Sequence, residues 1–319
     1  MKAYRRVRYG GPERLELRDI DLPVIGDEQV LVRVRASSAN AHDWHMLRGK
    51  PYLARLSEGF RAPKTPEIGL DVAGVVEAVG AAVTHLQPGD QAFGSRFGAF
   101  AEYVAGKTMM PMPSGLTFEE AAAIPTAGFT ALQGLRDKGQ LQPGQRVAIN
   151  GAGGGVGSLA VQIGRALGAE VTAVTGPRAL EMVSSLGADE VVDYTRDDFT
   201  RTRGRYDLIL DIGGNRRLSD LRRALKPDGR LVMVAPQPGN WIGPIARIAG
   251  AIVTNRLGRQ PAIPYLAVPN RDDLGVLAGM VEAGTLRPVI DRSFGFEQIP
   301  EAIRYLERGQ ATGKVVIGF

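Results

Sequence analysis

Apolar and polar residues alternate with different periods in different parts of this chain. Before about residue 115, short runs such as 29–35 (QVLVRVR) and 71–79 (DVAGVVEAV) alternate every second residue and are separated by Gly and Pro turns. This pattern is typical of a small barrel or sandwich of short strands. From there to about residue 268, apolar runs of strand length alternate with helical patterns. Such alternation predicts a doubly wound parallel sheet with helices on both faces.

The elements of this second part follow one another at regular intervals. A capping box at Thr117 and Glu120 predicts a helix start, and Pro125 separates it from a further helix at 126–135. The strands of the sheet are expected at residues 145–149, 170–175, 190–194, 206–211, 230–235 and 262–268. A turn at 227–229 (PDG) is expected before the fifth strand. Beyond residue 270 the pattern predicts a helix, a strand, a helix and a strand, at 272–283, 287–291, 300–308 and 314–317.

Residues 145–175 contain the segment around which the second part is organised. A predicted strand (QRVAI) leads into a glycine-rich loop (NGAGGGVG) and then into a helix with one apolar face. A pyrophosphate must come close to the free N–H groups of a helix N-terminus, and glycine allows this because it has no Cβ. The strand, loop, helix and second strand therefore predict a dinucleotide site. Its expected contacts are Gly151, Gly153, Gly154, Gly155, Val156 and Gly157.

The end of the following strand indicates which dinucleotide is bound. An NAD site usually has Asp or Glu about 20 residues past the loop, where the carboxylate holds the ribose 2′-hydroxyl. This chain has Thr175 at that place, and Arg178 follows shortly after it. A 2′-phosphate is repelled by a carboxylate and held by a guanidinium. We therefore predict NADP(H) as the cofactor, with Thr175 and Arg178 among its contacts.

Composition argues against several other functions. The chain has 319 residues, enough for two domains, and its net charge of +5 is not gathered in any basic run. It has no cysteine, which excludes disulfides, a thiolate nucleophile and a cysteine-based zinc site. The N-terminus lacks the apolar core of a signal peptide, and no run approaches the ~18 apolar residues of a spanning helix. We expect a cytoplasmic protein with a small-molecule substrate and no nucleic-acid or membrane partner.

A set of motifs spread over nearly the whole chain carries a family likeness. The stretches are 68–80 (IGLDVAGVVEAVG), 98–104 (GAFAEYV), 121–132 (AAAIPTAGFTAL), the glycine loop, 208–214 (LILDIGG), 225–234 and 313–317. Together they resemble the zinc-free branch of the medium-chain dehydrogenase/reductase superfamily, the quinone oxidoreductase (zeta-crystallin-like) group. The resemblance implies an α/β protein in which a Rossmann NADP-binding domain, 117–269, is inserted into a GroES-like β-barrel catalytic domain, 1–116 and 270–319. It also implies NADPH-dependent reduction of quinones or α,β-unsaturated carbonyls, commonly by a homodimer.

The chain departs from the zinc-dependent relatives at the metal ligands. Those relatives carry a Gly-His-Glu motif where this chain has Leu70 in place of the histidine, and their cysteine ligands are missing here. Without a Lewis acid, alcohol oxidation lacks the metal that would stabilise an alkoxide. His42 and His45 lie close together in sequence, but a third ligand is not evident. We therefore predict no metal ion.

Reduction of an enone requires a hydrogen-bond donor near the carbonyl oxygen and a proton after hydride transfer. Asn40 lies in a stretch (NAHDWH) that resembles the family's active-site segment, and it is a candidate to donate its amide N–H to nicotinamide or substrate. Tyr52 is a candidate hydroxyl donor. The resemblance implies cofactor contacts from Thr126, Thr130, Tyr194 and Lys314. The carboxyl ends of later strands, where such sheets bind ligands, add Ile212, Gly213 and Ala235.

Two other functions are compatible with the sequence. One is a metal-independent alcohol or carbonyl dehydrogenase, which alcohol oxidation would support. The other is a non-catalytic NADPH-binding protein, since the superfamily includes crystallins, and tight binding without turnover would support it. The sequence does not name the substrate, because the expected pocket stretches, 52–64 and 237–259, are poorly covered by the resemblance.

Overall fold

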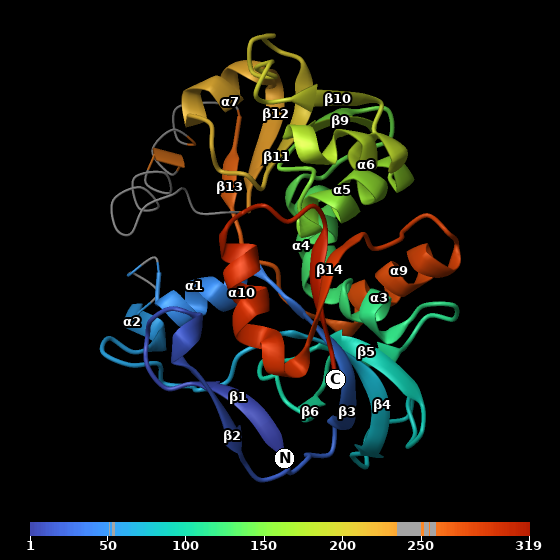
Figure 1. The fold of residues 1–319 in the computed structure, drawn as a ribbon. Coiled ribbons are helices and arrows are strands. Elements are labelled where there is room, and N and C mark those ends of the chain that lie inside the picture. The colour runs from blue at the N-terminus through green and yellow to red at the C-terminus, as the bar shows by residue number, and fades with distance from the viewer. Residues whose placement is uncertain (51, 53–54, 235–249, 252–254, 256–259) are drawn as a thin grey trace. The chain divides into compact units, whose positions relative to one another are not determined.

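The computed structural model describes the whole chain except residues 51, 53–54, 235–249, 252–254 and 256–259 (Figure 1). It divides into two compact units. One, here called the terminal unit, combines Met1–Ala127 with Pro269–Phe319, and the other, the central unit, is Gly128–Val268. The two ends of the chain thus build one unit together. The finer domain limits expected from the sequence, 1–116, 117–269 and 270–319, stay a prediction.

A seven-stranded sheet forms the framework of the terminal unit (Figure 1). Its order is β14-β15-β3-β4-β5-β7, and β6 also pairs with β3. Neighbouring strands are antiparallel except for the parallel pair β14 and β15. The strands are β3 (Val30–Ala39), β4 (Asp71–Val79), β5 (Gln91–Ser95), β6 (Tyr103–Gly106), β7 (Met109–Pro111), β14 (Ile290–Gly295) and β15 (Lys314–Gly318). A separate hairpin joins β1 (Lys2–Arg6) to β2 (Leu15–Asp19).

The register of this sheet brings three strand ends together. β15 pairs with β3 so that Val315 lies opposite Ala39, and β3 pairs with β4 so that Ser38 lies opposite Asp71. Because both pairs are antiparallel, the start of β15, the end of β3 and the start of β4 share one edge. The period-2 alternation fixes this register, since a slip by one residue would expose the apolar side of each strand. That side contributes Val30, Val32, Val34, Val72 and Val76 to one core.

Helices of the terminal unit cover this framework. They are α1 (Ala41–Arg48), α2 (Arg55–Glu58), α3 (Phe118–Ala122), α9 (Arg271–Glu282) and α10 (Ile299–Glu307), with 3₁₀ turns η1 (Pro12–Arg14) and η5 (Phe296–Gln298). The predicted capping box is confirmed, because Thr117 Oγ1 accepts from the Glu120 N–H at 3.2 Å and Glu120 Oε2 accepts from the Thr117 N–H at 2.9 Å. Helix α4 (Pro125–Leu132) begins in the terminal unit and ends in the central unit.

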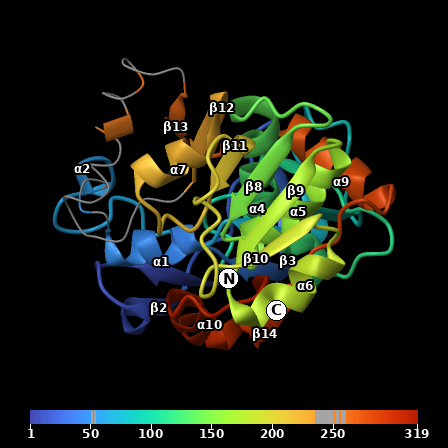
Figure 2. The same cartoon turned by 90° about the horizontal axis from the view of Figure 1, so that it is seen from above.

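The central unit is built on a six-stranded sheet in the order β10-β9-β8-β11-β12-β13, and all its neighbouring pairs are parallel (Figure 2). Numbered along the chain, this is the order 3-2-1-4-5-6 of a Rossmann fold, so the predicted fold class is confirmed. The strands are β8 (Arg146–Asn150), β9 (Glu170–Thr175), β10 (Glu190–Asp193), β11 (Tyr206–Asp211), β12 (Leu225–Met233) and β13 (Ala262–Pro264). The helical elements are α5 (Gly155–Ala166), α6 (Leu180–Ser185), α7 (Leu218–Ala224), a π-helical turn η3 (Gln133–Lys138) and a 3₁₀ turn η4 (Pro177–Ala179).

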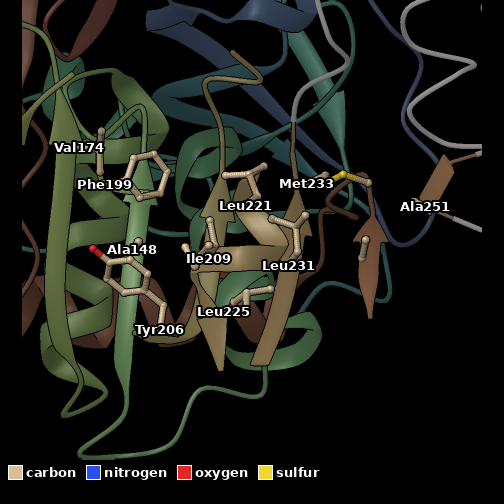
Figure 3. Close-up of a cluster of buried hydrophobic side chains, with 12 residues drawn as sticks. Ala148, Val174, Phe199, Tyr206, Ile209, Leu221, Leu225, Leu231, Met233 and Ala251 are labelled. Atoms are coloured by element: carbon tan, nitrogen blue, oxygen red, sulfur yellow. The ribbon is translucent and has the colours of Figure 1, made fainter. Parts of the chain in front are cut away.

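Helices lie on both faces of this sheet. On one face, Leu221 of α7 shares a buried cluster with Ile209 and Leu231 from the neighbouring strands β11 and β12 (Figure 3). On the other face, Gly164 of α5 lies against Val147 of β8. Alternate residues of each strand therefore face opposite helical layers, which is why these strands read as continuous apolar runs.

Two strand starts differ from the expected ones. β12 begins at Leu225, so the expected turn at 227–229 lies inside the strand, and a register shift after Tyr206 accommodates it. β14 begins at Ile290 instead of residue 287, because Pro288 has no N–H to give to a ladder. Within the described ranges, no helix is both long and apolar enough to cross a membrane.

Candidate functional site

The glycine loop connects β8 to the N-terminus of α5 in the central unit. It turns away from β8 at Gly151, whose φ of +96° is a conformation that favours glycine. The N–H groups of Gly151 and Ala152 both donate to the Val174 carbonyl at 3.0 Å, which fixes the loop against β9. Gly154 is the N-cap of α5. The first N–H groups of the helix, from Gly155 onward, have no acceptor within the helix and form its positive end.

The glycines of the loop meet different surroundings. A Cβ on Gly157 would lie 2.1 Å from the Gly151 carbonyl oxygen, so this glycine is required for the helix to pack on the loop. A Cβ on Gly153 would lie 2.4 Å from Thr175 Oγ1. At Gly154, by contrast, the nearest atom of the described residues would be 3.8 Å away. The loop is thus packed on one side and has room for a ligand at Gly154.

Thr175, Arg178 and Tyr194 lie together at the end of β9. The Tyr194 N–H donates to the Thr175 carbonyl at 3.0 Å, and the Tyr194 hydroxyl would lie 3.1 Å from a Cβ on Gly176. Arg178 follows in η4 and is exposed. The structure therefore brings the three predicted residues to the edge of the sheet that also holds Gly153.

The acidic residue next to Thr175, Asp193 on β10, has its carboxylate bonded within its own turn. Asp193 lies opposite Thr175 in the parallel pair of β10 and β9. Its carboxylate accepts from the hydroxyl and the N–H of Thr195 at 2.7 and 2.9 Å, and these bonds lower the pKa of Asp193. The carboxylate is thus occupied by its own turn.

A buried polar network joins β8 to β11 beside the loop. The Asn150 amide donates to Asp211 Oδ1 at 2.7 Å and to Asn215 Oδ1 at 2.9 Å. The N–H groups of Ile212 and Gly213 donate to the Asn150 carbonyl at 2.9 and 3.0 Å. The predicted residues 212 and 213 therefore adjoin the glycine loop. Sequence reasoning did not assign a role to Asn150, although its place at the end of the first Rossmann strand is a usable signal.

One predicted cofactor contact cannot be placed in this way. Ala235 follows β12 along the chain and lies outside the described residues.

A second polar cluster lies in the terminal unit, at the shared edge of β15, β3 and β4, and we call it the Asp71 cluster. Asp71 is fully buried. Its Oδ1 accepts from the Thr126 N–H at 2.8 Å and from the Thr126 hydroxyl at 2.6 Å. Its Oδ2 accepts from Ser38 Oγ, Asn40 Nδ2 and Lys314 Nζ, at 2.6, 2.9 and 3.2 Å. The predicted residues Asn40, Thr126 and Lys314 thus meet on one carboxylate.

Asp71 itself was not among the predicted site residues. In the sequence it is the first residue of the expected strand 71–79, where a structural role is the simplest interpretation. Five donors on one buried carboxylate show that it organises the cluster instead. Its position directly after Leu70, where zinc-dependent relatives carry their motif, was the available signal.

Asn40 is fully engaged in this cluster. Its amide group donates to Asp71 Oδ2 at 2.9 Å and to the Ser38 carbonyl at 3.2 Å, and its Oδ1 accepts from Lys314 at 2.7 Å. An amide group has two N–H donors. The predicted donation from Asn40 to nicotinamide or substrate would therefore require one of these bonds to break.

Asp43 lies behind the cluster and has an unusual proton affinity. It is buried at the start of α1, where its Oδ2 accepts from the Asn40 N–H at 2.7 Å. Burial raises the pKa of Asp43 to about 7, the charge of Asp71 adds to the shift, and the Asn40 N–H and Lys314 oppose it. This carboxyl is thus close to half-protonated near neutral pH.

The remaining predicted residues have separate surroundings. The Tyr52 ring lies under the Arg55 guanidinium, with the guanidinium carbon 4.6 Å from the ring centre, so one of its contacts is with α2. Thr130 lies one turn after Thr126 in α4, and its carbonyl accepts from the Tyr265 hydroxyl.

The histidines show no shared ligand geometry. His45 stacks on Trp44, its Nδ1 is 3.2 Å from the Lys50 carbonyl, and burial lowers its pKa to about 4. His85 is half-buried, with Nε2 3.0 Å from the Met109 carbonyl. In the part of the chain that the structure describes, no three His, Cys, Asp or Glu residues form a group that could hold a metal ion.

Comparisons with known proteins agree with this architecture. The family described as "Alcohol dehydrogenase GroES-like domain" matches residues 26–115, and the family described as "Zinc-binding dehydrogenase" matches residues 186–317. The chloroplastic NADPH-dependent alkenal/one oxidoreductase of Arabidopsis thaliana is 32% identical over 99% of this chain and 79% of its own length. The quinone oxidoreductase of Homo sapiens is also 32% identical, over 99% of this chain and 97% of its own.

A solved structure is similarly close. The quinone oxidoreductase from Coxiella burnetii superposes with a TM-score of 0.85 at 28% identity, covering 100% of this chain and 99% of that one. A Rossmann sheet with a glycine loop, whose residues lie along the chain between the two segments of a unit built from both chain ends, defines a medium-chain dehydrogenase/reductase. Within that superfamily the chain belongs to the quinone oxidoreductase group. The family expected from the sequence motifs is confirmed.

Proposed function

We propose that the protein is an NADPH-dependent oxidoreductase that transfers a hydride to a quinone or an α,β-unsaturated carbonyl without a metal ion. One observation carries the proposal. The positive end of α5 lies behind a loop with room at Gly154, and Thr175 and Arg178 stand where an NAD site has a carboxylate. The names of the two relatives, an NADPH-dependent alkenal/one oxidoreductase and a quinone oxidoreductase, support the reaction.

The residues of the central unit fit a dinucleotide that carries a 2′-phosphate. A pyrophosphate placed at Gly154 would meet the free N–H groups of α5. Arg178 is exposed, and no ion pair among the described residues engages its guanidinium. Tyr194 is 45% exposed next to Gly176, so its ring offers a flat surface on the adenosine side.

The chemistry divides between the cofactor and the chain. When bound, NADPH supplies the hydride, and a proton completes the reduction of an enone to a saturated carbonyl or of a quinone to a hydroquinone. The chain holds and orients the reactants. In the central unit, Asn150 fixes residues 212 and 213 against the glycine loop. In the terminal unit, the Asp71 cluster provides charged hydrogen-bonding groups.

Metal independence is supported by the available ligand atoms. The chain has no cysteine, and Leu70 stands where zinc-dependent relatives have a histidine. One matching family is nevertheless described as "Zinc-binding dehydrogenase". Because the zinc ligands of the relatives are missing here, we expect turnover that is unchanged by a strong chelator.

A homodimer is part of the same proposal. β13 is an edge strand of the central sheet, but the Asn255 side chain already bonds the N–H and the carbonyl of Ala262, so the support for a dimer comes from the apolar residues that follow the strand. The residues just after it include Leu266 and Val268, which are 85% and 67% exposed. Light scattering coupled to size exclusion should give twice the mass of 34.1 kDa, and a monomer at micromolar concentration would contradict this part. Cytoplasmic localisation stays a prediction.

The function is tested by following the oxidation of NADPH with a panel of quinones, alkenals and simple ketones, and the reduction of NADP⁺ with alcohols. We expect turnover with quinones or alkenals, with NADPH preferred over NADH. Turnover confined to ketones and alcohols would instead support an alcohol or carbonyl dehydrogenase. Tight NADPH binding, measured by calorimetry, without turnover on any compound would support a non-catalytic role.

A further inference from the structure

The Asp71 cluster holds a cation, Lys314, with one N–H donor that has no acceptor in the part of the chain that the structure describes. The Lys314 ammonium has three N–H donors. Two are directed at Asn40 Oδ1 and Asp71 Oδ2, at 2.7 and 3.2 Å. Among the described residues no acceptor is found for the third, although the side chain is only 3% exposed. An unpaired N–H on a buried cation is costly, so a ligand oxygen placed there would gain a strong bond.

The other donors of the cluster are already committed. Asn40 uses both amide hydrogens, on Asp71 and on the Ser38 carbonyl. The hydroxyl hydrogens of Ser38 and Thr126 both go to the Asp71 carboxylate. Lys314 is therefore the member of this cluster that can donate without breaking a bond.

The two oxygens of Asp71 have separate tasks. Oδ1 is held by the N–H and hydroxyl of Thr126 at the N-terminus of α4, where a carboxylate is favoured by the helix dipole. Oδ2 faces Asn40 and Lys314 from the neighbouring strand ends. The carboxylate is thus anchored on one side and fixes the ammonium on the other.

We propose that Lys314 donates a hydrogen bond to the carbonyl oxygen of the reducible substrate, and that Asp71 is a positioning residue that acts through Lys314. This inference rests on the proposed function. When a hydride adds to an enone or a quinone, negative charge develops on the carbonyl oxygen. A charged donor that is already held in a buried, water-poor place stabilises this charge without having to reorganise. Asn40 then serves to hold Lys314, which replaces the donor role expected for it from the sequence.

The test compares three variants by kcat, KM, the Kd for NADPH and the melting temperature. Lys314→Met removes the donor and keeps the length of the side chain. Because it leaves Asp71 buried without its cation, it can fail to fold. The double variant Asp71→Asn with Lys314→Met removes both charges together and avoids this penalty. Ser37→Ala is the matched control, because Ser37 Oγ donates at 2.6 Å to the backbone carbonyl of Asp71 and not to its carboxylate.

We expect kcat to fall by about 10²-fold in Lys314→Met and in the double variant, as when one oxyanion donor is lost. The Kd for NADPH should stay within about threefold, the double variant should melt close to the wild type, and Ser37→Ala should keep kcat within about twofold. A folded double variant with wild-type kcat would overturn the inference, since Lys314 would then only balance the charge of Asp71. A weaker Kd for NADPH with unchanged kcat would overturn it too. Absence of wild-type turnover with any quinone or enone would remove the proposed function as well.

Discussion

Replacing Gly157 and Gly154 by alanine, one at a time, separates two tasks of the glycine loop. A Cβ at position 157 would lie 2.1 Å from the Gly151 carbonyl oxygen and 2.5 Å from the Ala152 Cα. Both are backbone atoms, so the contact is relieved only if the helix or the loop shifts by about 1 Å from its packed position. Overpacking of this kind costs about 1–3 kcal/mol. We expect Gly157→Ala to melt roughly 3–10 °C below the wild type.

Gly154→Ala should have the opposite profile. Its φ of −89° and ψ of 179° are open to any L-residue, and the new Cβ would have its nearest described neighbour at 3.8 Å. The loss of glycine at an N-cap costs at most about 1 kcal/mol. The methyl group would, however, occupy the place that a pyrophosphate needs, so we expect the Kd for NADPH to rise at least about tenfold, or about 1.4 kcal/mol.

The assay for both variants is thermal unfolding without ligand and calorimetric titration with NADPH. Gly279→Ala is the control, because a Cβ there, on α9, has no described atom within 4 Å. It should leave both quantities unchanged or raise the melting temperature slightly. A Gly154→Ala variant that binds NADPH like the wild type would refute the placement of the phosphates. A Gly157→Ala variant as stable as the wild type would refute the packing argument.

Three further results are expected. Arg178→Ala should weaken NADPH binding and spare NADH, measured as two Kd values, and an equal loss for both would remove its role at the 2′-phosphate. The pKa of Asp43 is raised from 3.8 to about 7. Between these two pH values the folded state keeps a proton that the unfolded state has released. The free energy of unfolding should therefore fall by up to roughly 4 kcal/mol as the pH rises from about 4 to about 7. Urea unfolding at several pH values should show this decline in the wild type and a flatter profile in Asp43→Asn, and identical profiles would contradict it. Arg6, fully buried, donates to two backbone carbonyls and to Glu58; Arg6→Met should lose at least about 2 kcal/mol in urea unfolding, and a change under about 0.5 would contradict the role of these bonds.

In the central unit, most helices and strands could be predicted from residues that are close in the sequence. The strand, glycine loop, helix and strand of residues 145–175 were predicted within a few residues, because all their signals lie within one βαβ unit. The same holds for the capping box at Thr117, whose two partners are three positions apart. Boundaries failed where a long-range pairing overrode a local signal. At β12 the ladder with β11 extends the strand through the expected turn at 227–229.

The Asp71 cluster could not be predicted from local sequence patterns. Its members come from positions 38, 40, 71, 126 and 314, which only the register of β15, β3 and β4 and the start of α4 bring together. From the sequence, Asn40, Thr126 and Lys314 were predicted as separate site residues, and only because of the family resemblance. It did not mark Asp71 as their common acceptor, because a hydrogen-bond partner is a property of position in space.

Local patterns in the amino-acid sequence were therefore sufficient to predict the periodic elements, the dinucleotide loop, the missing acid at Thr175 and the family. These features depend on residues that are close in the sequence, and such residues are also close in space. The tertiary structure alone decided which donors remain unused. Among the described residues, both amide hydrogens of Asn40 have acceptors and one hydrogen of Lys314 has none, because antiparallel pairing brings Lys314 Nζ to 2.7 Å from Asn40 Oδ1, 274 positions away in the sequence.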